Sequence, residues 1–354
     1  MKITIVDLFC GIGGLTHGLE RAGLDVVAGF DIDPTCKYAY EENNNAEFIE
    51  ADIANVCHEK ISRYYKGSDI RVLVGCAPCQ PFSKYTMRYR KNIDDDNCNK
   101  KHSKWNLVES FADKIRLILP DVVSMENVPE LVDTQVFKHF VATLKNLKYH
   151  VSYSIAFCPD YGVPQNRKRL ILLASRLGEI SLIEPKYTPD TYKTVKDAIF
   201  AMSKIKAGER CKKDPLHFSA SLSDKNLLRI KASKQGGTWR DWDEDLQLTC
   251  HKKSTGKTYA SVYGRMSWDS PSPTITTQFY GYGNGRFGHP EQDRAISVRE
   301  GAVLQSFPPS YKLIEKGSES KTRNLGIHIG NAVPVELGKA IGKSIKKHIL
   351  EVSE

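Results

Sequence analysis

Two cysteines in the segment GCAPCQPFS, residues 75–83, are the first candidates for chemistry. Cys76 and Cys79 have Cys-x-x-Cys spacing, which suits a redox pair, half of a zinc site, or one nucleophile beside a thiol that takes no part. The chain has no second such pair and no His pair at zinc-finger spacing, so a structural zinc site is disfavoured. A redox pair should open a helix, whereas Pro81 and the polar residues after it indicate a loop.

An acid and two arginines form the next candidate group. Glu126 follows the apolar run DVVSM, and an acid that leaves a buried strand is costly unless it is hydrogen-bonded or used. In QNRKRL, residues 165–170, Arg167 and Arg169 are two apart, so on a strand both side chains share one face. They are either surface residues in ion pairs or two donors directed into a ligand cleft.

A glycine-rich turn and two acids indicate a ligand site at successive strand ends. DLFCGIGG, residues 7–14, lies between a strand and a helix, where glycines let the backbone approach a ligand closely. Asp31 closes the second strand and Asp52 the third, positions at which a carboxylate commonly binds ribose hydroxyls. Each acid alone could be a helix N-cap, as is expected of Asp33, but together these features indicate an adenosine-type cofactor.

Alternating strand-like and helix-like segments must hold these residues in place. We expect strands at 2–9, 25–31, 46–52, 70–76, 121–127, 152–158 and 169–175, and helices at 15–23, 33–44, 105–119 and 136–149. This alternation predicts an α/β fold with a doubly wound sheet, whose ligands bind beyond the carboxyl ends of the strands. A polar loop is expected over 84–104, and loops of this length are typically lids or disordered segments.

The pattern changes after about residue 180. The chain becomes basic and rich in polar turns, and it continues into the Gly- and aromatic-rich stretch QFYGYGNGRFGHP at 278–290. This change predicts a smaller, less regular second domain. A last helix is expected over 334–352, because Pro334 can begin it and apolar residues then recur at helical spacing.

Composition limits the class of protein. The 354 residues are 40% hydrophobic and 26% charged, and no run approaches the about 20 apolar residues that span a bilayer. The first residues, MKITIVDLFCGIGG, do not form a signal peptide, and nine scattered cysteines argue against a disulfide framework. We expect a cytoplasmic protein with reduced thiols and no membrane partner. The net charge of +9 suits a nucleic-acid partner or an ordinary basic protein equally.

Six motifs in order make the chain resemble the cytosine-5 DNA methyltransferases of bacterial restriction-modification systems. They are DLFCGIGG, GCAPCQPFS, ENVPEL, QNRKRL, RAISVREGAVLQSFP at 294–308 and GNAVPVELGKAIG at 330–342. The resemblance covers nearly the whole chain, and only about 186–265 has no match, as expected of the family's variable target-recognition region. It implies a Rossmann-like S-adenosylmethionine-dependent methyltransferase fold with a mixed sheet. The implied domains are a catalytic, cofactor-binding domain of residues 1–180 and 325–354 and a small target-recognition domain of residues 186–320.

The resemblance implies S-adenosylmethionine as the cofactor, S-adenosylhomocysteine as its product, and no metal. Phe9 would stack on the adenine and Ile32 would pack against it. Asp31 would bind the ribose and Asp52 the adenine amino group, while Asn331 would help to close the pocket. The full set of implied cofactor-binding residues is Asp7, Phe9, Gly11, Gly13, Asp31, Ile32, Asp52, Ile53, Pro78 and Asn331.

The implied catalytic residues are Cys79, Glu126, Arg167 and Arg169. Addition of the Cys79 thiolate at C6 would turn a poorly nucleophilic cytosine into an enamine that accepts a methyl group at C5. Glu126 would hold N3 and the exocyclic amino group, while the arginines stabilise the developing charge, with Arg169 expected to contact the base. Cys76 is then expected to face the core, so that Cys76→Ala keeps most activity and Cys79→Ser abolishes it.

The implied substrate is a specific sequence in duplex DNA. Because C6 cannot be reached inside a duplex, the base must be flipped out, and the loop after Ser83 is the candidate to close over it. The expected DNA-contacting residues are Gln80, Ser83, Thr274, Thr276 and Arg286, while Arg299 is expected to brace the scaffold. The enzyme is expected to be a nucleoid-associated monomer in the cytoplasm that pairs functionally with a restriction endonuclease.

Two other interpretations are open. The first is the tRNA-methylating branch of the same family, but the Cys-Phe-Thr signature expected of that branch is absent from the sequence. The second is a binding module or redox protein in which the two cysteines are structural or a dithiol. That interpretation leaves Glu126, the arginine pair and the strand-end acids unexplained.

Overall fold

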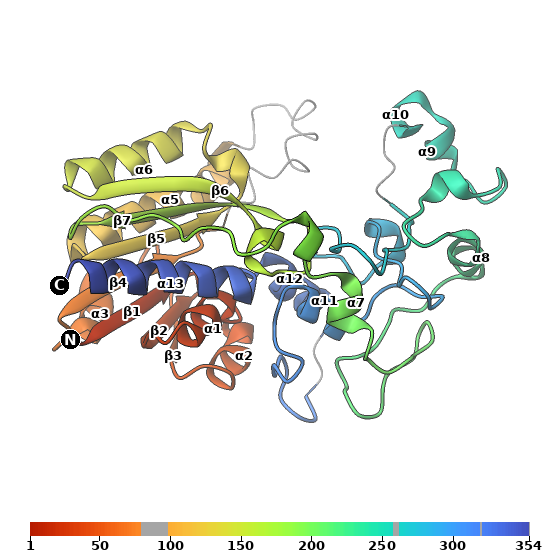
Figure 1. Ribbon diagram of the computed structural model, residues 1–354, viewed down its shortest axis with the longest axis horizontal. Helices are drawn as coiled ribbons and strands as arrows, with labels where there is room; N and C mark the ends of the chain where they lie inside the picture. Colours follow the sequence, from red (N-terminus) through yellow and green to blue (C-terminus); the bar gives the residue numbers. More distant parts are fainter. Residues whose placement is uncertain (79–97, 258–261, 319–320, 354) are drawn as a thin grey trace. The chain divides into compact units, whose positions relative to one another are not determined.

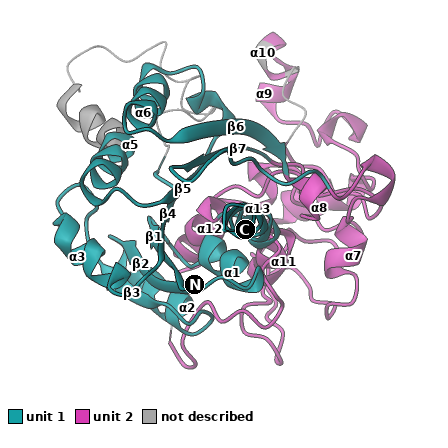
Figure 2. Ribbon diagram, turned by 60° about the vertical axis from the view of Figure 1, so that its left-hand side comes forward, with its two compact units in different colours: residues 1–157, 168–185, 333–354 teal, residues 158–167, 186–332 magenta. Residues whose placement is uncertain are grey.

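The computed structural model describes residues 1–78, 98–257, 262–318 and 321–353 (Figure 1). Two compact units divide the chain (Figure 2). Unit 1 consists of Met1–Phe157, Lys168–Pro185 and Val333–Glu354, and unit 2 consists of Cys158–Arg167 and Lys186–Ala332. Residues 325–332 therefore belong to unit 2, whereas the sequence-based limits assign them to the catalytic domain. Those functional limits stay a prediction.

Unit 1 is built on a seven-stranded sheet with the order β3-β2-β1-β4-β5-β7-β6. The strands are β1 (Ile3–Leu8), β2 (Val26–Asp31), β3 (Glu47–Glu50), β4 (Ile70–Gly75), β5 (Val122–Asn127), β6 (His150–Phe157) and β7 (Lys168–Ser175). Only β7 runs antiparallel to its neighbours, so the expected mixed, doubly wound sheet is confirmed. The order reverses between β1 and β4, which is where such sheets bind ligands.

Helices cover both faces of this sheet. They are α1 (Gly14–Arg21), α2 (Lys37–Glu41), α3 (His58–Ser62), α5 (Cys98–Ile118), α6 (Gln135–Asn146) and α13 (Val335–Glu351). In Figure 2, α3, α5 and α6 lie on one face and α1 and α13 on the other. Phe111 and Ile115 of α5 and Phe140 of α6 are fully or almost fully buried against the sheet. Burial of such large apolar side chains is the main favourable term in folding.

The long loop expected over 84–104 is shorter than predicted. Helix α5 begins at Cys98, so residues 98–104 are helical. Their polarity was taken for a loop signal, yet lysine has a good intrinsic helix propensity and does not oppose a helix. Residues 84–97 lie outside the described residues.

The last helix packs against the first. A Cβ added at Gly18 of α1 would lie 2.5 Å from the Val335 carbonyl oxygen and 2.6 Å from the Gly338 carbonyl carbon, so only glycine allows this approach. On α13, Ile341, Ile345 and Ile349 are fully buried at helical spacing, as the sequence predicted.

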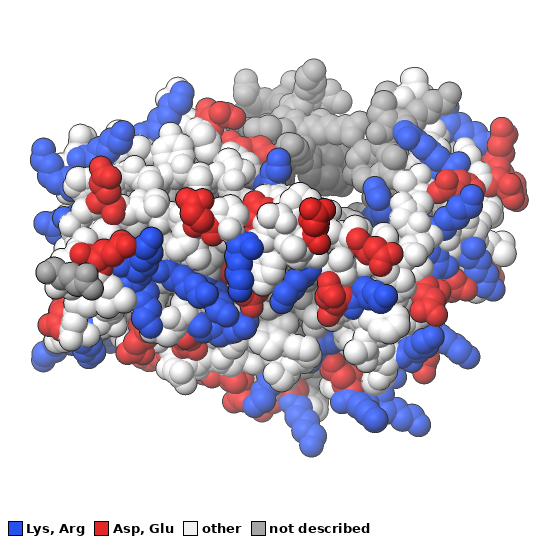
Figure 3. Space-filling view, viewed as in Figure 1, with Lys and Arg blue, Asp and Glu red and all other residues white. Residues whose placement is uncertain are grey.

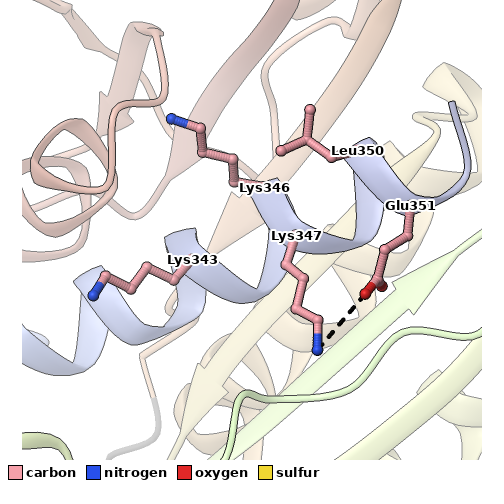
Figure 4. Close-up of a pocket in the computed structure, with 5 residues that line it drawn as sticks. All are labelled: Lys343, Lys346, Lys347, Leu350 and Glu351. Atoms are coloured by element: carbon pink, nitrogen blue, oxygen red, sulfur yellow. Dashed lines mark ion pairs between the residues drawn. The ribbon is translucent and has the colours of Figure 1, made fainter. Parts of the chain in front are cut away.

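The outer side of α13 is basic. Lys and Arg atoms gather along this helix in Figure 3. Figure 4 shows a shallow hollow there, lined by Lys343, Lys346, Lys347, Leu350 and Glu351. All five residues come from this one helix, and Lys347 pairs with Glu351 at 3.7 Å. The hollow is therefore the solvated face of a helix.

Unit 2 consists of short helices joined by irregular segments. Its helices are α7 (Val195–Ile199), α8 (Asp224–Ala232), α9 (Thr249–Lys252), α10 (Ser254–Lys257), α11 (Val298–Leu304) and α12 (Thr322–Asn331). One hydrophobic cluster centres on Ile230, Trp239, Trp242 and Tyr282. Strand pairing in the described part of unit 2 is limited to isolated bridges. The expected smaller, irregular second part is therefore present.

A buried ion pair anchors α11 in unit 2. Arg294 donates through Nη1 to Oε2 and through Nη2 to Oε1 of Glu300, both at 2.7 Å. The Ser297 amide donates to the same carboxylate at 2.6 Å, which completes a capping box. Burial raises the pKa of Glu300, but the hydrogen bonds and charge of Arg294 outweigh it and lower that pKa to about 2. Arg299 braces the same helix through Asp214 at 2.6 Å, as expected.

Candidate active site

Three strand ends in unit 1 bring an acid, an arginine and a thiol together. Glu126 lies near the end of β5, opposite Ile171 of β7, and Arg169 lies near the start of β7. Gly75, the last residue of β4, pairs with Met125, so Cys76 is next to Glu126. These side chains meet at one edge of the sheet, where the sequence predicts a ligand site.

Both oxygens of the Glu126 carboxylate have a partner. Arg169 donates from Nε to Oε1 at 2.9 Å, and Cys76 donates from Sγ to Oε2 at 2.6 Å. Glu126 is only 3% exposed, which makes these partners necessary. Each oxygen of this carboxyl group has two lone pairs, and one described donor binds each oxygen.

The expectation that Cys76 simply faces the core is therefore wrong. Its thiol contacts the candidate catalytic acid. Burial, followed by the nearby charge of Glu126, raises the pKa of Cys76 well above the ordinary value for a thiol. The group consequently stays protonated and acts as a donor. Cys10, Cys36, Cys57, Cys76, Cys158, Cys211 and Cys250 are all free of disulfide bonds.

Asn127 adjoins the candidate catalytic acid, and the sequence analysis did not single it out. It is 2% exposed, its Nδ2 donates to the Ala77 carbonyl at 3.1 Å, and its Oδ1 accepts from the Val128 amide at 2.9 Å. The amide thus holds the chain two residues before Cys79. The signal was its place beside Glu126 at the end of a buried strand. Pro78 is exposed, and Cys79, Gln80 and Ser83 lie outside the described residues.

The glycine-rich turn after β1 has an unusual backbone. Phe9, Gly11 and Gly13 have φ values of 60°, 50° and 84°, in the left-handed region. For Phe9 this conformation is strained, and such strain occurs mainly at functional sites. A Cβ at Gly11 would meet no atom within 4 Å, so open space adjoins the turn. The half-buried Phe9 ring contacts Phe111 edge-on at 6.5 Å.

The strand-end acids bind the backbone around this turn. Asp31 accepts from the Gly11 amide at 2.8 Å and from the Asp33 amide at 2.9 Å. Asp52 accepts from the Ala54 amide at 3.0 Å and from Asn55 Nδ2 at 2.7 Å. Neither acid is the N-cap of a helix, because Asp33 holds that position before the next 3-10 turn and Cys57 holds it before α3. Asp33 caps the next turn through the Thr35 amide, as expected.

The side chains after these acids differ in exposure. Ile32 is 64% exposed, which is unusual for a large apolar side chain directly after a buried strand and suits packing against a ligand. Ile53 is only 2% exposed and belongs to the hydrophobic core, so its side chain is committed to packing.

One carboxyl oxygen of Asp7 is buried and lacks a hydrogen-bond partner among the described residues. Thr16 Oγ1 donates to its Oδ2 at 2.8 Å, while Oδ1 has no hydrogen-bond partner among the described residues. Burial is the main cause that raises the pKa of Asp7 to about 7. Unsatisfied buried oxygens are rare in folded proteins and call for a ligand or a proton. Together with the open space at Gly11 and the exposed Ile32, this oxygen fits the cofactor that the sequence predicts.

Arg167 does not lie on the strand that carries Arg169. β7 begins at Lys168, so the rule that residues two apart share a face does not apply to this pair, and Arg167 belongs to unit 2. Its guanidinium is 3% exposed and donates to the carbonyl oxygens of Ile275 and Gly330, each at 3.1 Å. These bonds brace unit 2, and a catalytic role for Arg167 stays a prediction.

The remaining predicted residues also lie in unit 2. Thr274 Oγ1 donates to the Asn166 carbonyl at 2.6 Å, Thr276 is exposed, and Arg286 is half-buried. Asn331 is exposed at the end of α12. Their predicted contacts with DNA or cofactor are not tested by these positions.

Potential metal ligands and membrane segments need only brief mention. Cys57, His58 and Glu59 are consecutive residues at the start of α3, with donor atoms within 4.8 Å of one another. Neighbouring polar side chains on a helix end often lie this close without an ion, so we assign no metal. In the described part of the chain, no helix combines the length and apolar character needed to cross a membrane.

Comparison with known proteins identifies the family. The family described as C-5 cytosine-specific DNA methylase matches residues 3–347. Type II methylase M.HgiDII of Herpetosiphon aurantiacus is 50% identical over 348 residues, which cover 98% of this chain and 95% of that protein. Type II methyltransferase M1.HphI of Haemophilus parahaemolyticus is 30% identical over 355 residues, covering 98% and 87%.

A solved structure shows the same fold. It is a prophage-encoded protein of Escherichia coli, described as a DNA modification methyltransferase, with a TM-score of 0.71 over 99% of this chain and 100% of that chain. Its sequence is 21% identical, so the likeness concerns the fold alone.

Proposed function

Because the chain belongs to the family of C-5 cytosine-specific DNA methylases, we propose that it methylates C5 of a cytosine in a specific duplex DNA sequence, with S-adenosylmethionine as the methyl donor. The observation that carries this proposal is the buried pair of Glu126 and Arg169 at the strand ends beside the segment that leads to Cys79. An acid and a fixed cation next to a candidate nucleophile are the groups that addition to a pyrimidine requires.

S-adenosylmethionine, when bound, supplies an electrophilic methyl group on a sulfonium. The residues that would hold it are those of the turn after β1 and of the next two strand ends, with Phe9 and Ile32 against the adenine and Asp31 and Asp52 as acceptors. The open space at Gly11 supports this assignment. Gly13, Ile53 through its backbone, Pro78 and Asn331 complete the proposed set, and Asp7 lies beneath the turn.

Cys79 is the proposed nucleophile. Its thiolate forms a bond to C6, and the ring electrons move towards C5, N3 and the carbonyl oxygen. Glu126 supplies a proton or hydrogen bond at N3 and accepts from the exocyclic amino group, while Arg169 stabilises the negative charge that develops. Methyl transfer to C5 leaves S-adenosylhomocysteine. A water molecule then takes the C5 proton, the electrons of that C–H bond re-form the C5–C6 double bond, and the sulfur–C6 bond breaks to restore the thiolate.

The base must leave the duplex for this chemistry. C6 and C5 are covered by stacking inside DNA, so we propose that the cytosine is flipped out. Gln80 and Ser83 are proposed to contact DNA near the flipped base, and Thr274, Thr276 and Arg286 to contact DNA from unit 2. Asn127 would fix the approach of the nucleophile, because it holds the Ala77 carbonyl.

A transfer assay tests the proposal. Cofactor with a labelled methyl group is incubated with duplex DNA and, separately, with tRNA; label should enter only the DNA. Cys79→Ser should abolish transfer. A duplex with fluorine at C5 of the target cannot lose a proton there, so a denaturation-resistant adduct should accumulate with the wild type. Label in tRNA alone would favour the tRNA-methylating alternative, and label in neither polymer would overturn the proposal.

We further propose that the enzyme acts as a monomer in the cytoplasm and is paired with a restriction endonuclease of the same specificity. The support is the Type II description of its 50% identical relative. Bisulfite sequencing of DNA methylated by the purified enzyme would identify the target sequence. Cleavage by a companion endonuclease should then be blocked at that same sequence.

A further inference from the structure

The Cys76 thiol donates a hydrogen bond to the candidate catalytic acid, Glu126, which is a more specific contact than apolar packing. Its sulfur lies 2.6 Å from Oε2 of Glu126, while Arg169 Nε lies 2.9 Å from Oε1. All three residues belong to unit 1. The two donors therefore occupy different oxygens of one carboxylate.

We propose that Cys76 is a positioning residue, whose thiol and the Arg169 guanidinium together fix the plane of the Glu126 carboxylate for contact with the cytosine. The inference rests on the role of Glu126 in the proposed function. It assigns the first cysteine of the pair a task distinct from that of Cys79.

The arginine alone leaves the carboxylate free to turn. The terminal torsion of a glutamate is broad, because rotation about the bond to an sp² carbon has shallow wells. Arg169 forms a single bond to Oε1 from Nε, and its Nη1 donates instead to the Lys168 carbonyl at 2.8 Å. A bond to Oε2 is the second point that defines the plane. With Glu126 only 3% exposed, bulk water cannot reliably supply that bond.

The thiol is suited to donate and unsuited to attack. Burial and the neighbouring carboxylate keep Cys76 protonated, as the raised pKa of its thiol reflects. A protonated thiol is a poor nucleophile but still a hydrogen-bond donor. Cys76 is therefore not a second nucleophile, and its effect on the reaction is exerted through Glu126.

Four variants and one control test this inference. Cys76→Ala removes the donor, Cys76→Ser keeps a donor, and Glu126→Gln removes the acid that the donor holds. The double variant Cys76→Ala/Glu126→Gln shows whether the thiol acts through that acid. Cys158→Ala is the control, because Cys158 is a fully buried cysteine in unit 2 outside the proposed site.

The readouts are the single-turnover rate of methyl transfer, KM for DNA, and the melting temperature. We expect Cys76→Ala to lower the rate about tenfold with KM almost unchanged, since a lost hydrogen bond to a charged group has this order of effect. Cys76→Ser should recover at least about a third of the wild-type rate, and Cys158→Ala should keep all of it. In the Glu126→Gln background, Cys76→Ala should have no further effect, because the two residues act as one unit.

Two outcomes overturn the inference and leave the proposed function intact. One is a full rate for Cys76→Ala while Cys79→Ser is inactive and Glu126→Gln keeps only a slow but measurable rate. The other is an equal loss from Cys76→Ala in both backgrounds, which would mean general damage. A fully active Glu126→Gln would instead overturn the proposed function. If Cys76→Ala fails to fold, Cys76→Val replaces it, and equal rates for Cys76→Val and Cys76→Ser again overturn the inference.

Discussion

Each of the two units contains a buried glutamate beside an arginine, and the two pairs differ in how completely they are closed. In unit 2, Arg294 holds both oxygens of Glu300 through its two terminal nitrogens, and the Ser297 amide adds a third donor. In unit 1, Arg169 reaches one oxygen of Glu126 through Nε. The side chains of Arg294 and Arg169 are 0% and 15% exposed.

The structural pair of unit 2 and the candidate catalytic pair of unit 1 cannot be distinguished by residue type or by the burial of the glutamate. Both glutamates are almost fully buried, and both have a cation within hydrogen-bond distance. The difference is the number of fixed donors and the acceptor positions that they leave. In the closed pair, the hydrogen bonds offset the free-energy cost of removing both charges from water. The open pair has fewer fixed donors and keeps acceptor positions for a ligand.

Glu300→Gln should produce the largest loss of stability. The amide cannot balance the buried Arg294 charge, so we expect the free energy of unfolding to fall by about 3–5 kcal/mol. Chemical denaturation measures this loss. The matched control is Glu351→Gln, which makes the same change in an exposed pair with Lys347 and should cost no more than about 0.5 kcal/mol. Equal losses from the two variants would contradict the closed character of the unit 2 pair.

Acid should weaken the closed pair over a defined range. The pKa of Glu300 is lowered from 4.5 to about 2, so the stability that the pair provides is complete above pH 4.5 and is lost as the pH falls towards 2. His289, 3.8 Å away, has its pKa lowered to about 3 by burial, so acid destabilises the fold there as well. The difference in unfolding free energy between wild type and Glu300→Gln should shrink between pH 5 and 3. A constant difference would count against the assignment.

Arg169→Lys tests the open pair. Lysine keeps the charge but lacks the planar guanidinium, so the rate of methyl transfer should fall by about 10–100-fold. The free energy of unfolding should change by no more than about 1 kcal/mol, because lysine keeps a positive charge beside the buried Glu126. The matched variant is Arg294→Lys, which should lose stability and keep its rate where folded. A large stability loss from Arg169→Lys together with a rate loss from Arg294→Lys would contradict the distinction between the two pairs.

Asp7 is a third buried carboxyl, and no cation pairs with it among the residues that the structure describes. Burial raises its pKa from 3.8 to about 7, so the stability associated with its neutral form is present below pH 3.8 and lost as the pH rises through 7. Without cofactor, the unfolding free energy of the wild type should decrease by about 1 kcal/mol more between pH 6 and 8 than that of Asp7→Asn. Parallel pH profiles for the two proteins would exclude an ionisable Asp7 in this range.

Much of unit 1 could be predicted from the sequence because its strands are apolar runs, and some of them end in glycine or an acid, as β2 does at Asp31 and β4 at Gly75. The runs before Asp31 and before Glu126 both became central parallel strands. The contact between Cys76 and Glu126 could not be predicted. It depends on the register that pairs Gly75 with Met125 and on the rotamers of the two side chains.

Other features depend on distances along the chain that no local pattern reveals. The start of β7 at Lys168 separates Arg167 from Arg169, although QNRKRL reads as one continuous segment. Asp214 and Arg299 pair across 85 residues in a unit with little regular structure. Ser297 and Glu300 form a cap from residues three apart in the chain, a local signal that the sequence analysis did not use.

The packing of α13 on α1 has a consequence for the order in which the protein is made. Domains can begin to fold during synthesis, and α1 (Gly14–Arg21) leaves the ribosome well before α13 (Val335–Glu351). All of unit 2 is synthesised between these two helices. The surface around Gly18 therefore stays uncovered until α13 has been made. The turn that leads into α1 reaches its final support only after unit 2 has been produced.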